Sequence, residues 1–493
     1  MVRISQSLFA AFALSSATAV CIAVGCGGSS SNPFGGGLND ASTSGFGGTG
    51  SNGADGSNGS SGSGSSGGGF GSGANSGSSG SSGKPTGPCS GLGCSVNYAC
   101  ANGGHTTLTG TVYDPAGKNP IYNAVVFVPD DVSQLQAIKL GTNSCNTCDT
   151  PIGNYVAVAQ TDVKGHFTLN DVPTGKNVPL VVQIGKWRRV VTVPSIADCA
   201  TTTVASSGTG QARLPRNHTE GSMPAMALLT GGLDDLGCFM RRMGIDDGEY
   251  SAPHGGGRLD IYQGNGLLGP APGLSSGGTA GNCTGANCGL WSTKADLENY
   301  DIVLLACEGD TYENAKPTTA KQALDDWLNE GGKVFTTHFQ YVWFQNNPDP
   351  KFQQVATWLG TSVGIGMPNA TIDTSFPKGQ VLHDWLQNIG ALTGPGGTIA
   401  LNGVATSVSA VNAATPTSRW IYDSSSSDTK YLSFETPIGG TIADAGPEMG
   451  KKTYCGKAVF SDLHAGGAPK GDVPAACDPP GNLTPQEEAL EFL

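Results

Sequence analysis

The chain has 493 residues, with 76 glycines, 13% charged residues and a formal net charge of -13. This length has room for two or three domains. The acidic balance, without any basic patch in the sequence, argues against nucleic acid as a partner.

Residues 1–26 have the pattern of a bacterial lipoprotein signal peptide. Arg3 precedes an apolar run over residues 8–25 that is too short and too often interrupted for a membrane span. Residues 23–26, Ala-Val-Gly-Cys, resemble a lipobox, in which the cysteine is acylated and becomes the mature N terminus. We therefore expect a lipid anchor on Cys26, and because Gly27 rather than Asp follows, an outer-membrane lipoprotein of the cell envelope. Cys21 as the acylated residue, and secretion without an anchor, are the alternatives.

Residues 27–104 are predicted to form a tether with a cysteine-containing end. Up to residue 83 the segment is almost entirely Gly, Ser, Asn and Ala, which cannot build a core. We expect this part to be disordered, with a mean reach of about 40 Å.

Fourteen cysteines in an exported chain predict disulfide bonds. Closely spaced pairs such as Cys283 and Cys288 favour local loop staples. Cys145 and Cys148 could instead form a redox or zinc half-site. However, no second pair stands at zinc-finger spacing, and the Gly/Asn/Thr-rich surroundings offer no helix N terminus, so we favour a structural role.

Residues 105–195 predict an antiparallel β-sandwich. They contain six or seven short β-forming runs with no helical period, separated by turn signals at residues 114–115, 164–165 and 173–175. Residues 132–154 read as a loop insertion. The basic turn at residues 186–189 could bind an anionic or sugar ligand, but an inward-packed Trp187 with solvated arginines is the simpler interpretation.

This region resembles the carboxypeptidase regulatory-like family. The matching segments are residues 110–117, 123–128, 161–169 and 171–175. The resemblance implies a transthyretin-like Greek-key sandwich that is not itself catalytic.

After a linker at residues 196–224, the rest of the chain to residue 493 predicts an α/β domain. Apolar runs that read as strands alternate with segments of helical period, which favours a mostly parallel sheet. The predicted strands are residues 226–230, 258–263, 301–306, 333–337, 398–401, 419–422, 431–434 and 457–463. The predicted helices are residues 234–244, with Asp234 as N-cap, then 318–331, 349–360, 378–390 and 484–493. The last helix has no C-cap, so we expect the natural chain to continue beyond Leu493.

Residues 299–344 form the clearest unit, a predicted strand, helix and second strand. In such a unit the loops at the carboxyl ends of the strands face the ligand crevice. Glu308, Asp310, His338 and Gln340 are therefore expected along one rim.

The domain resembles the class I glutamine amidotransferase-like superfamily and, within it, the ThuA-like group. Residues 300–305, 327–338 and 456–464 are the matching segments. The resemblance implies a flavodoxin-like α/β fold. In the amidotransferases the strand matching residues 333–337 delivers a nucleophilic cysteine, but here His338 follows it, and Ala465 stands after His464 where the family has a glutamate. Glutaminase activity is therefore not expected. The resemblance to the ThuA-like group implies a histidine in the turn after the strand at residues 333–337. It also implies a connection with sugar metabolism.

The candidate site combines imidazoles and carboxylates from neighbouring strand ends. We predict His338, His464, Asp462 and Glu308 as catalytic residues. A divalent metal would be held by His338, His464, Asp310 and Asp234. The alternative is that His338 bonds locally and the acids cap helices. Cys307 is expected to be a core or disulfide cysteine rather than a displaced nucleophile.

Our first interpretation is a lipid-anchored cell-envelope protein that binds a carbohydrate or another envelope ligand, or that has a structural role. The alternative is a ThuA-like hydrolase that acts on a sugar or ester with a metal or by acid–base catalysis. We reject a tryptophan synthase α chain, because its (β/α)₈ barrel and cytoplasmic site do not suit an exported chain with a sandwich.

Overall fold

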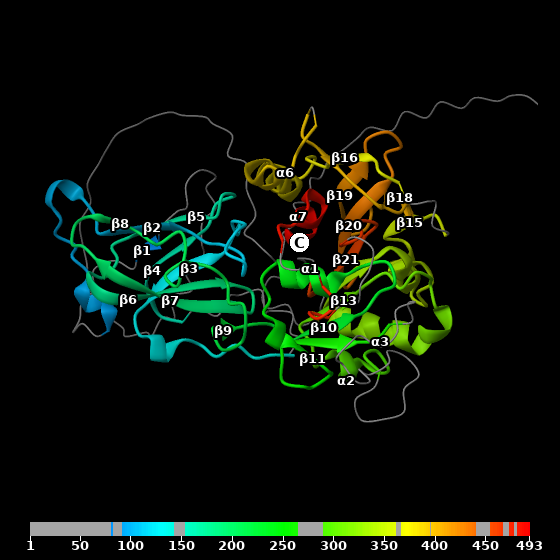
Figure 1. The fold of residues 1–493 in the computed structure, drawn as a ribbon, viewed down its shortest axis with the longest axis horizontal. Coiled ribbons are helices and arrows are strands. Elements are labelled where there is room, and N and C mark those ends of the chain that lie inside the picture. Colours follow the sequence, from blue (N-terminus) through cyan, green and yellow to red (C-terminus); the bar gives the residue numbers. More distant parts are fainter. Residues whose placement is uncertain are drawn as a thin grey trace, which may run out of the picture.

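The computed structural model describes residues 80–81, 91–141, 153–264, 289–360, 366–394, 396–439, 454–466, 473–477 and 481–493. The predicted signal peptide with Cys26, most of the tether, and the pairs Cys145/Cys148 and Cys283/Cys288 lie outside these residues. Figure 1 shows a β-rich part, coloured blue to teal, beside a larger part, coloured green to red, that contains both helices and strands. None of the described helices is long and apolar enough to cross a membrane.

The β-rich part consists of two sheets around one core. The larger sheet has the order β1-β4-β3-β6-β7-β9, and all of its pairs are antiparallel. The smaller sheet has the order β5-β2-β8. Leu108, Val126, Phe167, Leu180 and Val193 are among the buried side chains of the shared core. The strands are β1 Gly80–Ser81, β2 Thr107–Thr111, β3 Val125–Pro129, β4 Tyr155–Gln160, β5 His166–Asn170, β6 Gly175–Ile184, β7 Trp187–Ile196, β8 Thr201–Thr203 and β9 Gly221–Ser222.

The segment predicted as a linker is part of this structure. It supplies β8, which pairs with β2, and β9, which pairs with β7. Strand pairing therefore continues through a Thr/Ser/Gly-rich segment whose composition alone suggests a loop.

The second part contains a sheet of 12 strands within the described residues. From β11 through β12, β10, β13 and β14 to β21 every neighbouring pair is parallel, whereas β20, β19, β16 and β17 continue the sheet antiparallel. The central parallel strands are short apolar runs, as expected for strands covered on both faces. Their bounds are β10 Met226–Leu229, β11 Tyr250–Ser251, β12 Leu259–Tyr262, β13 Ile302–Leu305, β14 Lys333–Thr337 and β21 Gly456–Ser461. The others are β15 Ala356–Trp358, β16 Asn369–Ile372, β17 Thr398–Ala400, β18 Val408–Val411, β19 Thr417–Asp423 and β20 Thr429–Thr436.

Helices cover both faces of this sheet. One core includes residues of α2, α3, α4 and α5, and the other includes residues of α1, α6 and α7. The helix α3 buries Ala320, Leu324, Trp327 and Leu328, which recur at helical spacing as predicted. The helices are α1 Leu236–Arg242, α2 Lys294–Leu297, α3 Thr318–Asn329, α4 Val342–Gln345, α5 Pro350–Gln353, α6 Pro377–Ile389 and α7 Pro485–Glu491. Short 3₁₀ helices are η1 Leu92–Ser95, η2 Ala101–Gly103, η3 Val132–Gln134, η4 Asp247–Glu249, η5 Glu313–Ala315 and η6 His338–Tyr341.

The predicted helix over residues 349–360 is wrong beyond its first turn. Asp349 caps α5 as expected, since its Oδ1 accepts a hydrogen bond from the Lys351 N–H at 2.9 Å, but the helix ends at Gln353. Residues 356–358 instead form β15, which pairs with β18. The apolar spacing of this segment fits either structure, and pairing with a distant strand decides between them.

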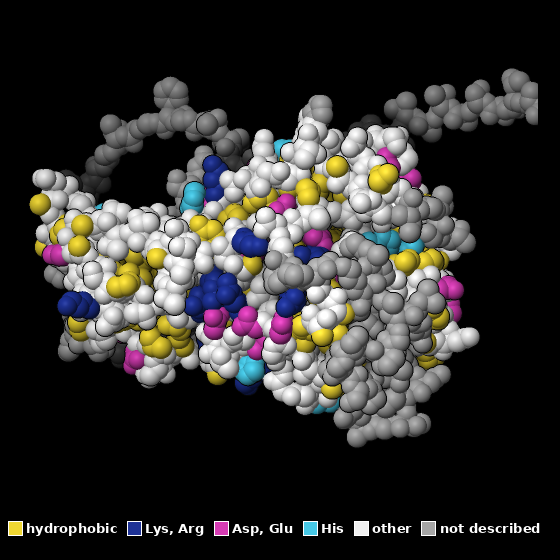
Figure 2. All heavy atoms as spheres, viewed as in Figure 1, with side chains coloured by type: hydrophobic (Ala, Val, Ile, Leu, Met, Phe, Trp, Pro, Cys, Tyr) yellow, Lys and Arg dark blue, Asp and Glu magenta, His cyan; other side chains and the backbone are white. Residues whose placement is uncertain are grey.

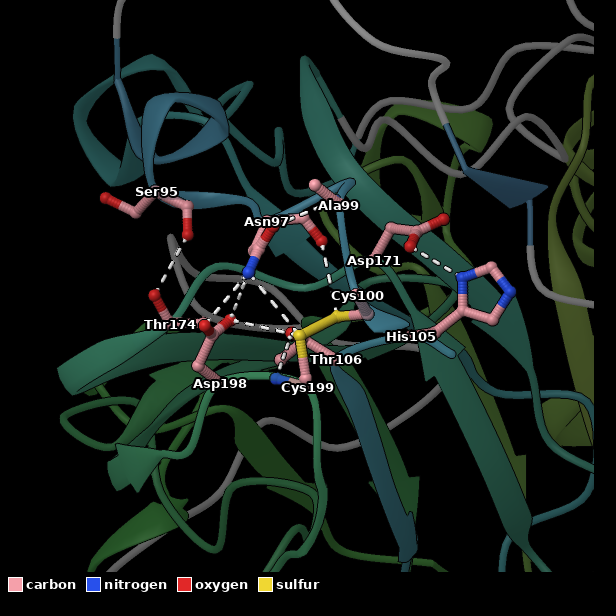
Figure 3. Close-up of a disulfide and its surroundings, with 10 residues drawn as sticks. All are labelled: Ser95, Asn97, Ala99, Cys100, His105, Thr106, Asp171, Thr174, Asp198 and Cys199. Carbon is pink, nitrogen blue, oxygen red and sulfur yellow. Dashed lines mark hydrogen bonds and ion pairs between the residues drawn. A yellow bond between two sulfur atoms is a disulfide. The ribbon is translucent and has the colours of Figure 1, made fainter. Parts of the chain in front are cut away.

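Between described residues, two disulfides join segments that are distant in the sequence. Cys100 and Cys199 are 99 residues apart, and Figure 3 shows their bond beside Asn97 and Asp198. Cys238 of α1 is bonded to Cys477, 239 residues later. The expectation of disulfides is thus confirmed for these two pairs, and both stabilise contacts between segments that sequence spacing does not relate.

The two parts contact each other through the loop that follows β2. Trp385 Nε1 of α6 donates to the Pro120 carbonyl at 2.7 Å, and the rings of Tyr122 and Phe492 stack with centroids 6.4 Å apart. Figure 2 shows basic side chains gathered near the middle of one face, around the place of β9, with acidic side chains beside them. Glu220, which directly precedes β9, accepts two hydrogen bonds from the Arg213 guanidinium, at 2.6 and 2.7 Å.

Candidate metal centre

Three parallel strands end side by side, and each is followed by a residue that can bind a metal. The neighbours β13, β14 and β21 lead into Cys307, His338 and His464, respectively. Because the carboxyl ends of parallel strands meet at one edge of a sheet, these side chains share that edge.

The three side chains are in contact. Cys307 Sγ lies 3.3 Å from His338 Nδ1, which lies 3.1 Å from His464 Nε2. All three atoms lie within 4.8 Å of one another, and the residues are 0%, 1% and 7% exposed. The two imidazoles, 126 residues apart in the chain, therefore occupy one buried site, as the predicted strand order requires.

Hydrogen bonds fix the orientation of His464. Its Nδ1 contacts the Gly403 carbonyl, which can only accept, so Nδ1 carries the proton. In the neutral ring Nε2 then has a free lone pair directed at His338 Nδ1. On His338 the other nitrogen, Nε2, is buried and has no hydrogen-bond partner among the described residues.

The sulfur of Cys307 is free of disulfide bonding and is surrounded by backbone donors. The N–H groups of Phe339 and Gly309 donate to it. Burial, and secondarily the charge of Asp234, nevertheless raise the pKa of this thiol well above its ordinary value. Burial and the neighbouring His464 lower the pKa of His338 to about 3. The pair is therefore neutral at pH 7 and does not form the thiolate–imidazolium pair of a cysteine nucleophile.

His338 occupies the turn after β14 with a left-handed backbone. Its φ is 40°, which is uncommon for a residue with a side chain, and Phe339 stacks on its ring with centroids 4.1 Å apart. Non-glycine residues hold such a conformation where surrounding contacts enforce it, and such positions cluster at functional sites.

Asp234 lies behind the three residues rather than among them. It is fully buried, and its carboxylate accepts hydrogen bonds from the Cys307 N–H at 3.0 Å, the Ala465 N–H at 2.8 Å and the Thr337 hydroxyl. The carboxylate predicted as a metal ligand and helix cap therefore joins the ends of the three strands, and Asp235 takes the N-cap position of α1.

The other predicted carboxylates are engaged elsewhere. Asp462 accepts hydrogen bonds from the Ser407 N–H and hydroxyl at 2.7 and 2.6 Å, and burial raises its pKa to about 6. Glu308 forms a fully buried ion pair with Lys316 at 2.5 Å and accepts from Gln340 Nε2 at 3.1 Å. Asp310 is exposed, and its Oδ1 accepts from the Thr311 N–H. None of the three belongs to the cluster of ligating atoms. Glu308 is paired with Lys316, Asp462 is hydrogen-bonded to Ser407, and Asp310 is exposed to solvent.

Sequence reasoning missed two members of the site. Cys307, expected in the core or in a disulfide, contacts His338, and the Gly403 carbonyl orients His464. Cys307 could have been found, because it follows a predicted strand at the same edge as His338. No sequence signal marks Gly403, because its role depends on where its loop passes.

The donor set fits a borderline or soft metal ion. One thiolate and two imidazoles are typical ligands of zinc and copper, whereas calcium and magnesium prefer oxygen. Around a tetrahedral zinc ion such donors lie about 3.3–3.6 Å apart. The contacts of 3.1 and 3.3 Å are close to that spacing.

No protein-family model and no curated protein matches the chain. Among solved structures, a protein described as thua-like from Bacteroides uniformis is similar, with a TM-score of 0.28 and 9% identity, covering 54% of this chain and 87% of that one. A cytoplasmic protein from Salmonella typhimurium has a TM-score of 0.24 and 9% identity, covering 49% and 87%. Another, from Salmonella typhimurium LT2, has a TM-score of 0.25 and 10% identity, covering 49% and 88%.

Proposed function

We propose that the α/β domain binds a zinc-like ion through Cys307, His338 and His464, and that this centre serves hydrolysis of a sugar or ester at the cell envelope. The observation that carries the proposal is the buried cluster of three ligating atoms within 4.8 Å. Three protein ligands are typical of catalytic zinc sites, which keep a fourth position open. A bound ion of this kind would supply Lewis-acid polarisation of a substrate oxygen.

The surroundings of the ligands support metal binding. A metal-binding histidine usually donates its second ring nitrogen to a carbonyl or carboxylate, as His464 does to Gly403. The two N–H groups directed at Cys307 Sγ stabilise a thiolate once a cation is present. Both features exist before any ion binds, so these two ligands are already oriented.

Metal analysis of the purified full chain tests the binding step. We expect a single zinc-class ion per chain after mild purification, and its loss in His338→Ala and in His464→Ala. His166→Ala is the matched control. This exposed histidine lies in the β-rich part, where it pairs with Asp162, and it is not one of the proposed ligands. Metal retained in both site variants, or lost equally in the control, would refute the site.

A structural metal that braces the strand ends is the second candidate. It is favoured by the burial of all three residues, which restricts access of a large substrate. Chelation separates the two functions. If the ion is catalytic, its removal is expected to abolish hydrolysis of nitrophenyl esters or glycosides and to change the melting temperature little. If the ion is structural, its removal is expected to lower the melting temperature strongly.

We also propose a specific fold for each of the two domains and a location for the protein in the cell envelope. The parallel strand order β12-β10-β13-β14-β21 supports a flavodoxin-like core. Numbered along the chain, these five strands have the order 2-1-3-4-5, which is the flavodoxin order. The antiparallel pairs of the β-rich part support a Greek-key module of the carboxypeptidase regulatory-like type. The lipobox-like residues 23–26 support anchoring through Cys26 in the outer membrane. Acyl labelling that is lost in Cys26→Ser tests the anchor.

A further inference from the structure

Asp234 is a buried carboxylate whose partners are all uncharged. Within the described residues its hydrogen bonds go to two backbone N–H groups and one hydroxyl. Three donors stabilise a buried carboxylate, but they do not cancel its charge. A neighbouring cation would.

Each of these bonds ends at or beside a proposed metal ligand. One donor belongs to Cys307 itself, Thr337 directly precedes His338, and Ala465 directly follows His464. The negative charge of Asp234 is therefore held beside the three proposed ligands, although Asp234 contributes no atom to the cluster of ligating atoms.

We infer that the charge of Asp234 shifts the preference of the centre toward a divalent ion and away from a monovalent ion, for example toward Zn²⁺ and away from Cu⁺. This inference rests on the proposed metal centre. A thiolate and the Asp234 carboxylate carry two negative charges, and the two imidazoles are neutral. A divalent ion brings the buried site to zero net charge, whereas a monovalent ion leaves one negative charge that burial makes costly.

The test compares affinities of the reduced full chain for Zn²⁺ and Cu⁺, measured by competition with chromogenic chelators. Asp234→Asn removes the charge and keeps one oxygen acceptor. We expect it to weaken Zn²⁺ binding by about tenfold or more and Cu⁺ binding by much less, because a fixed negative charge attracts a doubly charged ion more strongly than a singly charged one. Asp234→Glu keeps the charge but shifts its position, so it is expected to preserve the ratio of the two affinities even where both fall.

Asp462→Asn is the matched control. Asp462 is equally buried, but its hydrogen bonds go to Ser407, and its charge interacts with Lys430 more strongly than with His464. We expect the control to change stability and not the ratio of affinities.

Three outcomes would overturn the inference. Both ions could weaken equally in Asp234→Asn, which leaves the ratio unchanged, the ratio could shift in Asp234→Glu, or Asp462→Asn could shift it as much as Asp234→Asn does. The Asp234→Glu result keeps the inference testable if Asp234→Asn fails to fold. A wild-type chain that binds neither ion would instead refute the proposed centre itself.

Discussion

The side chain of Cys307 changes which metal ions the site is expected to prefer. The predicted ligand set of two imidazoles with carboxylates suits many divalent ions, whereas the observed set of one sulfur and two imidazoles favours zinc or copper. The histidines could be predicted because each directly follows, or nearly follows, a recognisable apolar strand. The carboxylates could not, because Glu308 and Asp462 are held by Lys316 and Ser407, which the sequence does not place near them.

The buried ion pair between Glu308 and Lys316 gives a prediction at this scale. Both side chains are fully buried, so Lys316→Met leaves an unpaired buried carboxylate and is expected to cost about 3–5 kcal/mol of unfolding free energy. Changing Glu308→Leu in the same chain is expected to recover much of this loss. Chemical denaturation measures both.

Lys294→Met is the matched control, because Lys294 pairs with Glu330 on the surface. We expect no measurable change there. A Lys316→Met chain as stable as the wild type would show that the buried pair contributes nothing to the fold.

At the scale of elements, the sequence predicts best where one face or both faces of an element are apolar. The strands β13, β14 and β21 and the helices α3 and α6 were predictable, because their apolar residues recur with the period of the element. The failures include β15, whose partner β18 is about fifty residues further along, and β8 and β9, whose residues are mostly polar. In each of these the deciding contact is non-local.

Close packing between α3 and the start of β21 gives a prediction for these elements. A Cβ added at Gly456 would lie 1.9 Å from the Leu328 carbonyl oxygen and 2.7 Å from that of Gly332. Since both obstacles are backbone atoms, Gly456→Ala is expected to force the strand and helix apart at a cost of about 1–3 kcal/mol.

Gly248→Ala serves as its control, since a Cβ there meets no atom within 4 Å. Melting temperatures of the two variants give the comparison. Equal melting temperatures would contradict the packing described for this junction.

At the scale of the whole molecule, the contact between the two parts contains a pair of carboxyl groups. Asp114 lies in the loop after β2 and Glu491 in α7, and the two are close enough for the charge of Asp114 to act on Glu491. Burial raises the pKa of Asp114 to about 6 and that of Glu491 to about 8, the latter also through the charge of Asp114. Asn119 donates to Glu491 at 2.6 Å, Lys118 faces Asp114, and Glu488 adds a further negative charge.

These shifts predict a pH-dependent stability. Both carboxyls hold protons more tightly in the folded chain than in the unfolded chain, where their pKa is about 4. Their contribution to stability is therefore complete below about pH 4 and is lost as the pH rises through the folded values of about 6 and 8.

Glu491→Gln removes one titrating group and keeps the hydrogen-bonding shape. We expect the loss of melting temperature between pH 5 and pH 8 to become smaller in this variant than in the wild type. The same slope in both chains would contradict a role for this pair. Nothing in the sequence indicates the contact, because the two residues are 377 positions apart, and only folding brings them together.

The central claim is that three strand ends deliver one metal site, and anomalous X-ray diffraction from crystals of the full chain tests it most directly. With data collected on both sides of the zinc absorption edge, we predict a single strong anomalous peak bounded by Cys307 Sγ, His338 Nδ1 and His464 Nε2. A zinc-loaded crystal that shows no peak at these three atoms, or shows it only at other residues, would contradict the account.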